Sequence, residues 1–239
     1  MTVFHKAILA GAVEVARAER TNDLYRGVLL QRDGSVVAAN SQIRYIAQPS
    51  SAKVYDFLSF AKAGTLVNDV SISWDQLTNL LKMVPKDQQF KGALEHIDMS
   101  NAEGNLINVV FNDGKGEGKF KLRSSEVSPV LSSWRKYFQE LGVGMSGQQE
   151  FVFNRKRLNM VIDAIETSCK YDGEFSYIVQ RPFSNGYIWR CLNELTGQLV
   201  LIAFIMPRVE EVVEHSDWEK NLFTRVKSLN GRRHYVVGS

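Results

Sequence analysis

Hydrophobic positions in the first fifty residues change from a helical spacing to an alternating one. Over residues 4–20 the apolar side chains share one face at intervals of three to four residues, which predicts a helix; they are Phe4, Ile8, Gly11, Ala12 and Val15. Three short segments with the composition of strands follow, with an Asp-Gly turn at 32–34 and a second turn at 40–41. We expect these strands at residues 24–31, 35–39 and 42–47.

The same order of elements returns in the next part of the chain. After an expected strand at 66–72, Ser73 and Gln76 have the spacing of a capping box, and Pro85 marks the end of the helix that follows. Strands are expected at 90–99, 105–112 and 118–123. The glycine-rich residues 113–119 between the last two favour a hairpin tip over a phosphate-binding loop. The helix is expected to bury Leu77, Leu80, Leu81 and Val84.

A third copy of this order begins at residues 150–153. Asn154 is the expected cap of a helix with an apolar stripe at Leu158, Val161, Ile162, Ile165 and Cys169. Strands are expected at 175–181, 186–192 and 198–204. Repeated units of one helix and several antiparallel strands predict an α+β fold in which the helices cover one face of the sheets.

Two domains are expected from this arrangement. The first covers residues 1–126, a connector covers 127–147, and the second covers 148–239. The connector has apolar residues at helical spacing, so it is either a helix or an interdomain link. Only three of the four units that two full domains require are recognised. Residues 208–239 are an added element, either a subunit contact or a frayed end.

The amino-acid composition excludes some classes of protein but does not indicate a function. The 239 residues are 44% hydrophobic and 23% charged, with a formal net charge of +3, which excludes a disordered chain and a polybasic membrane anchor. The first residues lack the order of a secretory signal, and the longest apolar run, 199–207, is about half of a membrane span. We therefore expect a cytoplasmic protein with no membrane partner.

Candidate catalytic chemistry is sparse. The four histidines and two cysteines have no metal-ligand spacing, and no phosphate-binding or nucleophile motif occurs, so we predict no enzyme, no metal and no cofactor. Cys169 lies on the apolar stripe of its helix, which favours a core role over a nucleophilic one. His96, with Glu95 and Asp98, could transfer protons only if the fold gathered them in a pocket.

Cations recur on the outward face of each predicted helix. The first of these faces also carries Val13, and the run Arg155-Lys156-Arg157 opens the third helix, where positive charge opposes the helix dipole. Solvation explains any single face, but recurrence favours loose contact with phosphates. The predicted DNA-contacting residues are Lys6, Arg17, Arg20, Lys82, Lys86, Arg155, Lys156 and Lys170.

Tryptophans offer a separate route to nucleic acid, because aromatic rings stack on single-stranded bases. Along the sequence the four tryptophans do not cluster with basic neighbours; Trp74 opens a helix and Trp189 alternates within a strand. We therefore expect them, with Trp134 and Trp218, in the core or at interfaces.

Several of these segments resemble the DNA sliding-clamp family, in particular the bacterial polymerase III beta clamp and its phage relatives. The resemblance is found in the hairpin at 27–40, in the strand and Pro-containing exit at 118–129, and in the apolar strand at 199–208, which ends in Met206-Pro207-Arg208. It extends over about residues 1–207, and the order of the motifs carries it. The family has Thr-Asp in place of Ala39-Asn40, and a further Met before its Arg.

The resemblance implies a clamp-like fold and a role without chemistry. Subunits would close a ring around duplex DNA, contact its phosphates without reading sequence, and dock polymerase peptides in a cleft at Phe204, Met206 and Pro207. It implies a homo-oligomer, dimer or trimer, that serves as a processivity factor of a phage or mobile element. The alternative is a clamp-like regulator from a phage or mobile element that binds a host replication or recombination protein without encircling DNA.

Overall fold

The helix-and-strand unit predicted from the sequence occurs three times. The computed structural model describes residues 2–18, 22–47, 65–85, 96–112, 116–134, 136, 155–169, 177–183, 186–192 and 199–205, all within the larger of two compact units, Met1–Pro207. The other unit, Arg208–Ser239, lies outside the described residues, together with the expectations for that extension.

The first two units each contain a leading strand, a helix and three further strands. The first comprises β1 (Thr2–His5), α1 (Lys6–Ala16), the 3-10 turn η1 (Asp23–Tyr25), β2 (Gly27–Leu30), β3 (Val36–Ala39) and β4 (Ile43–Ala47). The second comprises β5 (Val70–Ser73), α2 (Trp74–Met83), β6 (His96–Asn101), β7 (Leu106–Asn112) and β8 (Glu117–Arg123). The predicted hairpin between β7 and β8 is confirmed, with Asn112 paired to Glu117.

Each of these two units gives its first strand to the sheet of the other. β1 pairs antiparallel with β6, with Thr2 opposite Met99, in a four-stranded sheet of order β1-β6-β7-β8. β5 pairs antiparallel with β2, with Ser73 opposite Gly27. The two units are therefore interlocked.

The third unit extends the sheet of the first. It comprises α5 (Arg155–Cys169), β9 (Tyr177–Phe183), β10 (Gly186–Leu192) and β11 (Leu199–Ile205). β11 pairs antiparallel with β4, which gives a seven-stranded sheet of order β5-β2-β3-β4-β11-β10-β9. The short helix α3 (Pro129–Ser132) lies in the expected connector and is capped by the Ser128 side chain. The domain limits at 126 and 148 stay a prediction.

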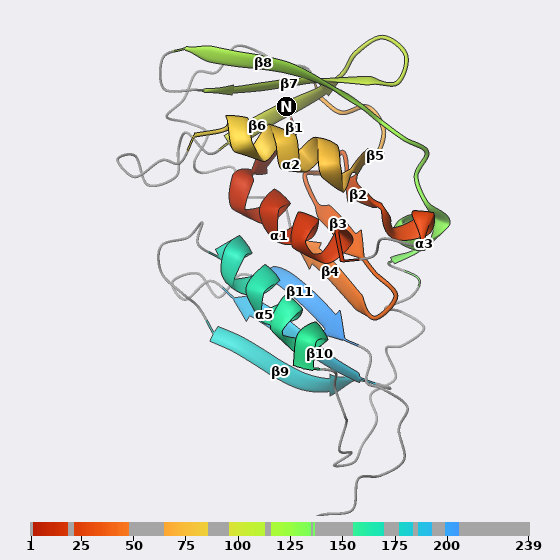
Figure 1. Ribbon diagram of the computed structural model, residues 1–239, viewed down its shortest axis with the longest axis vertical. Helices are drawn as coiled ribbons and strands as arrows, with labels where there is room; N and C mark the ends of the chain where they lie inside the picture. The colour runs from red at the N-terminus through yellow and green to blue at the C-terminus, as the bar shows by residue number, and fades with distance from the viewer. Residues whose placement is uncertain are drawn as a thin grey trace, which may run out of the picture. The chain divides into compact units, whose positions relative to one another are not determined.

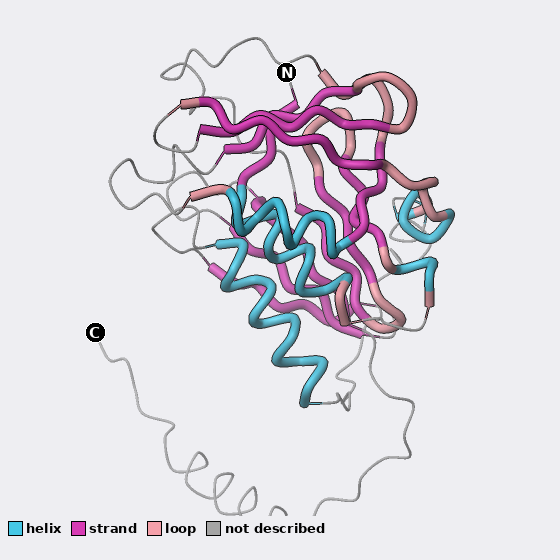
Figure 2. The backbone as a smooth tube through the Cα atoms, turned by 45° about the horizontal axis from the view of Figure 1, so that its top comes forward, coloured by secondary structure: helices cyan, strands magenta, loops and turns pink. Residues whose placement is uncertain are grey.

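Helices α2, α1 and α5 lie side by side in one layer (Figures 1 and 2). The main core lies beneath them and includes the fully buried Phe4, Tyr45, Leu77 and Ile97. A smaller cluster formed by Leu29, Val37, Ala39, Ile46 and Leu131 joins α3 to strands of the seven-stranded sheet. The predicted α+β class is confirmed.

The expected helix over residues 4–20 is wrong at both ends. Residues 2–5 form β1 instead, with Phe4 opposite Ile97, and α1 ends at Ala16. His5 marks the change, because its Nδ1 accepts a hydrogen bond from the Ala7 N–H at 3.1 Å and caps the new helix. The outward position predicted for Val13 is also wrong: helices flank α1 on both sides, and this side chain is 4% exposed.

The start of α2 differs from a capping box. Ser73 is the N-cap residue as predicted, but its side chain caps no backbone N–H. Instead, the Gln76 Nε2 donates to Ser73 Oγ at 2.9 Å, and Gln76 Oε1 accepts from the Arg123 N–H at 2.9 Å. Gln76 therefore ties α2 to the end of β8. Leu77, Leu80 and Val84 are buried as predicted, and Leu81 is partly buried.

The apolar stripe of α5 is shifted from its predicted position. Val161 and Ile165 are buried as expected, but Ile162 is 42% exposed, and Ala164 and Ser168 take its place on the buried side. Small side chains are preferred there because α5 crosses α1 at Gly11, where an added Cβ would overlap Ser168 Oγ and lie 2.7 Å from the Ala164 carbonyl oxygen. The side chain of Cys169 lies outside the described residues.

A buried hydroxyl pair fixes this helix crossing. Tyr45 Oη lies 2.6 Å from Ser168 Oγ and 3.1 Å from the Ile8 carbonyl oxygen, and Ser168 Oγ lies 2.7 Å from the Ala164 carbonyl oxygen. The two hydroxyl protons serve two of these three contacts at a time. The contacts join β4 of the first unit to α1 and to α5 of the third.

Tyr45→Phe is expected to destabilise the protein by about 1 kcal/mol, because the ring still fills its site while its hydrogen bonds are lost. Urea unfolding measures the change. Tyr25→Phe is the matched control, since Tyr25 is half-buried and its ring contact is with Arg44. Equal losses in both variants would contradict this role for Tyr45.

Candidate nucleic-acid interface

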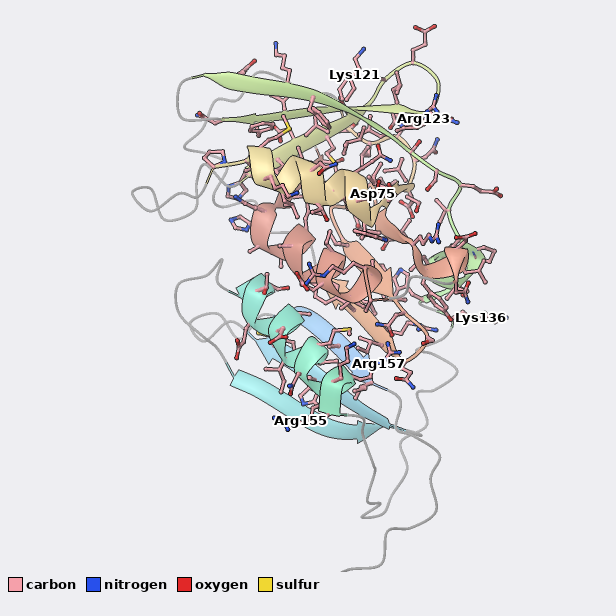
Figure 3. The ribbon with its side chains drawn as sticks, viewed as in Figure 1. Asp75, Lys121, Arg123, Lys136, Arg155 and Arg157 are labelled. Carbon is pink, nitrogen blue, oxygen red and sulfur yellow. The ribbon has the colours of Figure 1, made fainter. Side chains whose placement is uncertain are left out.

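An open groove of about 1380 Å³ lies at one end of the helical layer. The end of α1 contributes Glu14, Arg17 and Ala18, and the start of α2 contributes Trp74. The first turns of α5 contribute Arg155, Lys156, Arg157, Asn159, Met160 and Asp163. Figure 3 shows Arg155 and Arg157 together at the start of α5.

Antiparallel packing of the helices creates this groove. At the far end of α1, the Lys6 Nζ donates to the Val84 carbonyl just after α2, so α1 and α2 run in opposite directions. Near the groove, Asn40 Nδ2 contacts both the Val15 carbonyl of α1 and the Met160 Sδ of α5. The end of α1 therefore meets the starts of both α2 and α5.

Positive charge dominates the lining. Four cationic side chains face two carboxylates, and one of these, Glu14, pairs with Arg17 at 2.5 Å. The starts of α2 and α5 add the partial positive charge of two helix dipoles, and the end of α1 offsets one of them with partial negative charge. Arg157 Nη1 is buried and has no hydrogen-bond partner among the described residues. Burial of this donor without an acceptor is unfavourable, which favours a turn of the Arg157 side chain toward an anion in the groove.

The structure brings together three of the eight predicted DNA-contacting residues. Arg17, Arg155 and Lys156 line the groove. Lys6 lies at the opposite end of α1 with its ammonium bonded to Val84, and Lys82 is exposed in the last turn of α2. Arg20, Lys86 and Lys170 lie outside the described residues.

Of the three residues predicted to form the peptide cleft, the structure describes the backbone of Phe204. Phe204 lies in β11, opposite Ile188 of β10 and Arg44 of β4, and alternates with the buried Ala203 and Ile205. Met206 and Pro207 lie outside the described residues.

The sequence pattern assigned no nucleic-acid contact to three of the lining residues, Trp74, Arg157 and Asn159. Trp74 packs against the core, as expected, and also lines the groove. The cations that share this lining with Trp74 come from the end of α1 and the start of α5, far away in the sequence. The only local signal was the run Arg155-Lys156-Arg157 at a helix start, where cations are unfavourable for the helix itself.

Titratable groups also gather on β1 and β6, away from this groove. His5 and His96 are buried cross-strand neighbours with ring centroids 5.0 Å apart, and Asp98 follows on β6. Burial raises the pKa of Asp98 to about 6. Glu95 lies outside the described residues, and no three His, Cys, Asp or Glu side chains in the described ranges are grouped to hold a metal ion.

Among the helices described, none is long and apolar enough to cross a membrane.

Of the known proteins compared with this chain, solved structures are similar to it, whereas family models and curated proteins are not. No family model matches the chain, and no curated protein matches it. A putative DNA polymerase III beta subunit from Eubacterium rectale aligns with 89% of this chain at 8% identity and a TM-score of 0.46; this chain spans 66% of its length. A PCNA2–PCNA3 complex from Sulfolobus tokodaii aligns with 87% of this chain and 99% of that one, at 12% identity and a TM-score of 0.46.

Proposed function

We propose that this chain is a sliding-clamp-like accessory protein of DNA replication or recombination that holds nucleic acid through sequence-independent phosphate contacts. The observation that carries the proposal is the basic groove, where Arg17, Arg155, Lys156 and Arg157 converge from two helices. Cations on a rigid helical layer suit phosphate contact without base readout. The sequence resemblance to sliding clamps supports the same role.

Docking of polymerase peptides near Phe204, Met206 and Pro207 and assembly into a homo-oligomeric ring belong to this proposal. The proposed protein is not an enzyme: it tethers its partners. Light scattering over a range of concentrations tests assembly, and a discrete dimer or trimer that survives dilution is expected. A monomer at every concentration, with or without DNA, would contradict the ring and favour the alternative of a regulator that does not encircle DNA.

Arg155→Gln and Lys156→Gln each remove one cation from the groove. Each variant is expected to bind DNA about threefold more weakly, whatever the base sequence. Each change is expected to reduce the slope of log affinity against log salt by about 1, because one phosphate contact is lost. Fluorescence anisotropy with labelled DNA over a salt series measures both quantities.

The matched control removes cations elsewhere on the surface. Lys119→Gln and Lys121→Gln change exposed positions of β8 and alter the net charge by the same amount; Figure 3 labels Lys121 on this strand. Their affinity and salt slope are expected to stay near those of the unaltered protein. If all four variants weaken binding equally, net charge alone explains the binding, and the groove is not the site.

A further inference from the structure

Positive charge along the helical layer is local rather than continuous. Outside the groove, the exposed side chains of α2 and α5 have mixed charge: the carboxylates Asp75 and Glu166 stand beside the single cation Lys82 among the described residues of these helices, and Lys6 at the far end already donates to Val84. A duplex lying along the layer would place phosphates near these carboxylates. The cations at the groove instead suit a short stretch of one strand.

Trp74 adds an aromatic surface to these cations. It is half-buried and packs against the main core while lining the groove. Its backbone is held on both sides: its N–H donates to the Arg26 carbonyl at 3.2 Å, and its carbonyl accepts from Thr78 Oγ1 at 2.7 Å. Its packing against the core restricts the side chain, so an aromatic contact here costs little conformational freedom on binding.

Two further side chains in the groove lining can bind parts of a nucleotide. Arg157 lines the groove, and its buried Nη1 has no acceptor in the part of the chain that the structure describes, so a turn of this side chain toward a phosphate oxygen would satisfy that donor. Asn159 is exposed in the lining, and its amide can donate to a phosphate or sugar oxygen, a contact that reads no base. Asp163 and the paired Glu14 disfavour phosphate on their side, so the strand is expected to follow the start of α5.

We propose that this groove binds single-stranded nucleic acid, with one base stacked on Trp74 and the adjacent phosphates on Arg155, Lys156 and Arg157. The inference rests on the proposed function, since it requires the groove to be the nucleic-acid site. Bases in a duplex are stacked on each other and cannot reach an aromatic side chain, so single strands are preferred. The groove volume of about 1380 Å³ exceeds that of ordinary small-molecule pockets, about 300–1,000 Å³, as an extended ligand requires.

The test compares a labelled oligothymidylate with a duplex of equal strand length by fluorescence anisotropy. Trp74→Leu retains an apolar side chain against the core but cannot stack. It is expected to weaken single-strand binding about tenfold and duplex binding less than twofold. Trp74→Phe retains an aromatic ring and is expected to restore most of the single-strand affinity. Thermal unfolding of each variant verifies that it is folded.

Trp134→Leu is the matched control, because Trp134 is also half-buried against a hydrophobic cluster but does not line the groove. It is expected to bind both ligands like the unaltered protein. Equal affinity for single strand and duplex, with Trp74→Leu neutral and Arg155→Gln still weakening, would overturn this inference and leave the proposed function in place. Absence of binding to either ligand would overturn both.

Discussion

Replacing Gly11 with alanine is expected to destabilise the protein by about 2 kcal/mol, although alanine is the better helix former by about 1 kcal/mol. The added Cβ would overlap Ser168 Oγ, and it would lie 2.7 Å from the Ala164 carbonyl oxygen and 3.1 Å from the Tyr45 hydroxyl. The serine can rotate, but the carbonyl belongs to the backbone of α5, so the two helices must separate. Urea unfolding measures the loss.

Two companion variants show whether the helix crossing is the cause. Gly116→Ala makes the same change where an added Cβ meets nothing within 4 Å, so little loss is expected. Adding Ser168→Ala to Gly11→Ala removes the hydroxyl overlap and is expected to recover only part of the stability, since the Ala164 carbonyl remains. Full stability in Gly11→Ala alone would show that α1 and α5 are not closely packed here.

The buried carboxylate of Asp98 is expected to lower the free energy of unfolding by about 3 kcal/mol above pH 6, and Asp98→Asn is expected to remove this pH-dependent loss. Burial raises the pKa of Asp98 from 3.8 to about 6, and each unit corresponds to about 1.4 kcal/mol. Below pH 3.8 the carboxyl is protonated in both folded and unfolded states. Between pH 3.8 and 6 the carboxyl ionises in the unfolded state but stays protonated in the folded state, so the free energy of unfolding falls as the pH rises. Above pH 6 it is ionised in both states, and the loss of stability stays at its full value.

Urea unfolding of both proteins at several pH values from 4 to 8 measures this effect. The stability of the unaltered protein relative to Asp98→Asn is expected to fall between about pH 4 and 6 and to level off at higher pH. Glu103→Gln, in an exposed turn, is the control and is expected to show no such fall. A constant difference between the unaltered protein and Asp98→Asn across this range would contradict the buried, proton-retaining carboxyl.

The elements of this fold were predictable where a single local pattern decides them. The hairpin of β7 and β8 follows from two alternating segments around a glycine-rich turn, and α2 follows from its apolar spacing between Ser73 and Pro85. The start of α1 was not predictable in this way. Phe4 and His5 fit the helical spacing, but pairing with Ile97 and His96 of a distant strand draws them into β1.

Tertiary contacts also explain the error in α5. Hydrophobicity along the sequence favours Ile162 for the buried side, but close approach to Gly11 requires small residues, and Ala164 and Ser168 supply them. Val13 is buried for a related reason, because α1 has helices on both flanks. A helical pattern shows which face is apolar but not how many neighbours the helix has.

The sequence predicted which types of residue form the candidate site better than it predicted where in the fold they lie. Basic helix faces suggested phosphate contact, yet Arg17 and Arg155 line one groove because β11 pairs with β4 and α5 lies beside α1. The same arrangement places Trp74 in a groove that cations also line, which the local sequence does not indicate. Lys6, on the same helix as Arg17, lies at its other end and interacts with Val84 instead.

The exchange of leading strands between the first two units has a consequence for folding during synthesis. β1 leaves the ribosome well before its partner β6, which is made only after the whole first unit and α2. At about 5–20 residues per second, β1 waits on the order of 5–20 s. Contacts this distant in sequence also slow folding. During that interval β6 is absent from its place beside β1, and the apolar Val3 and Phe4 are open to chaperones or to pairing with another chain.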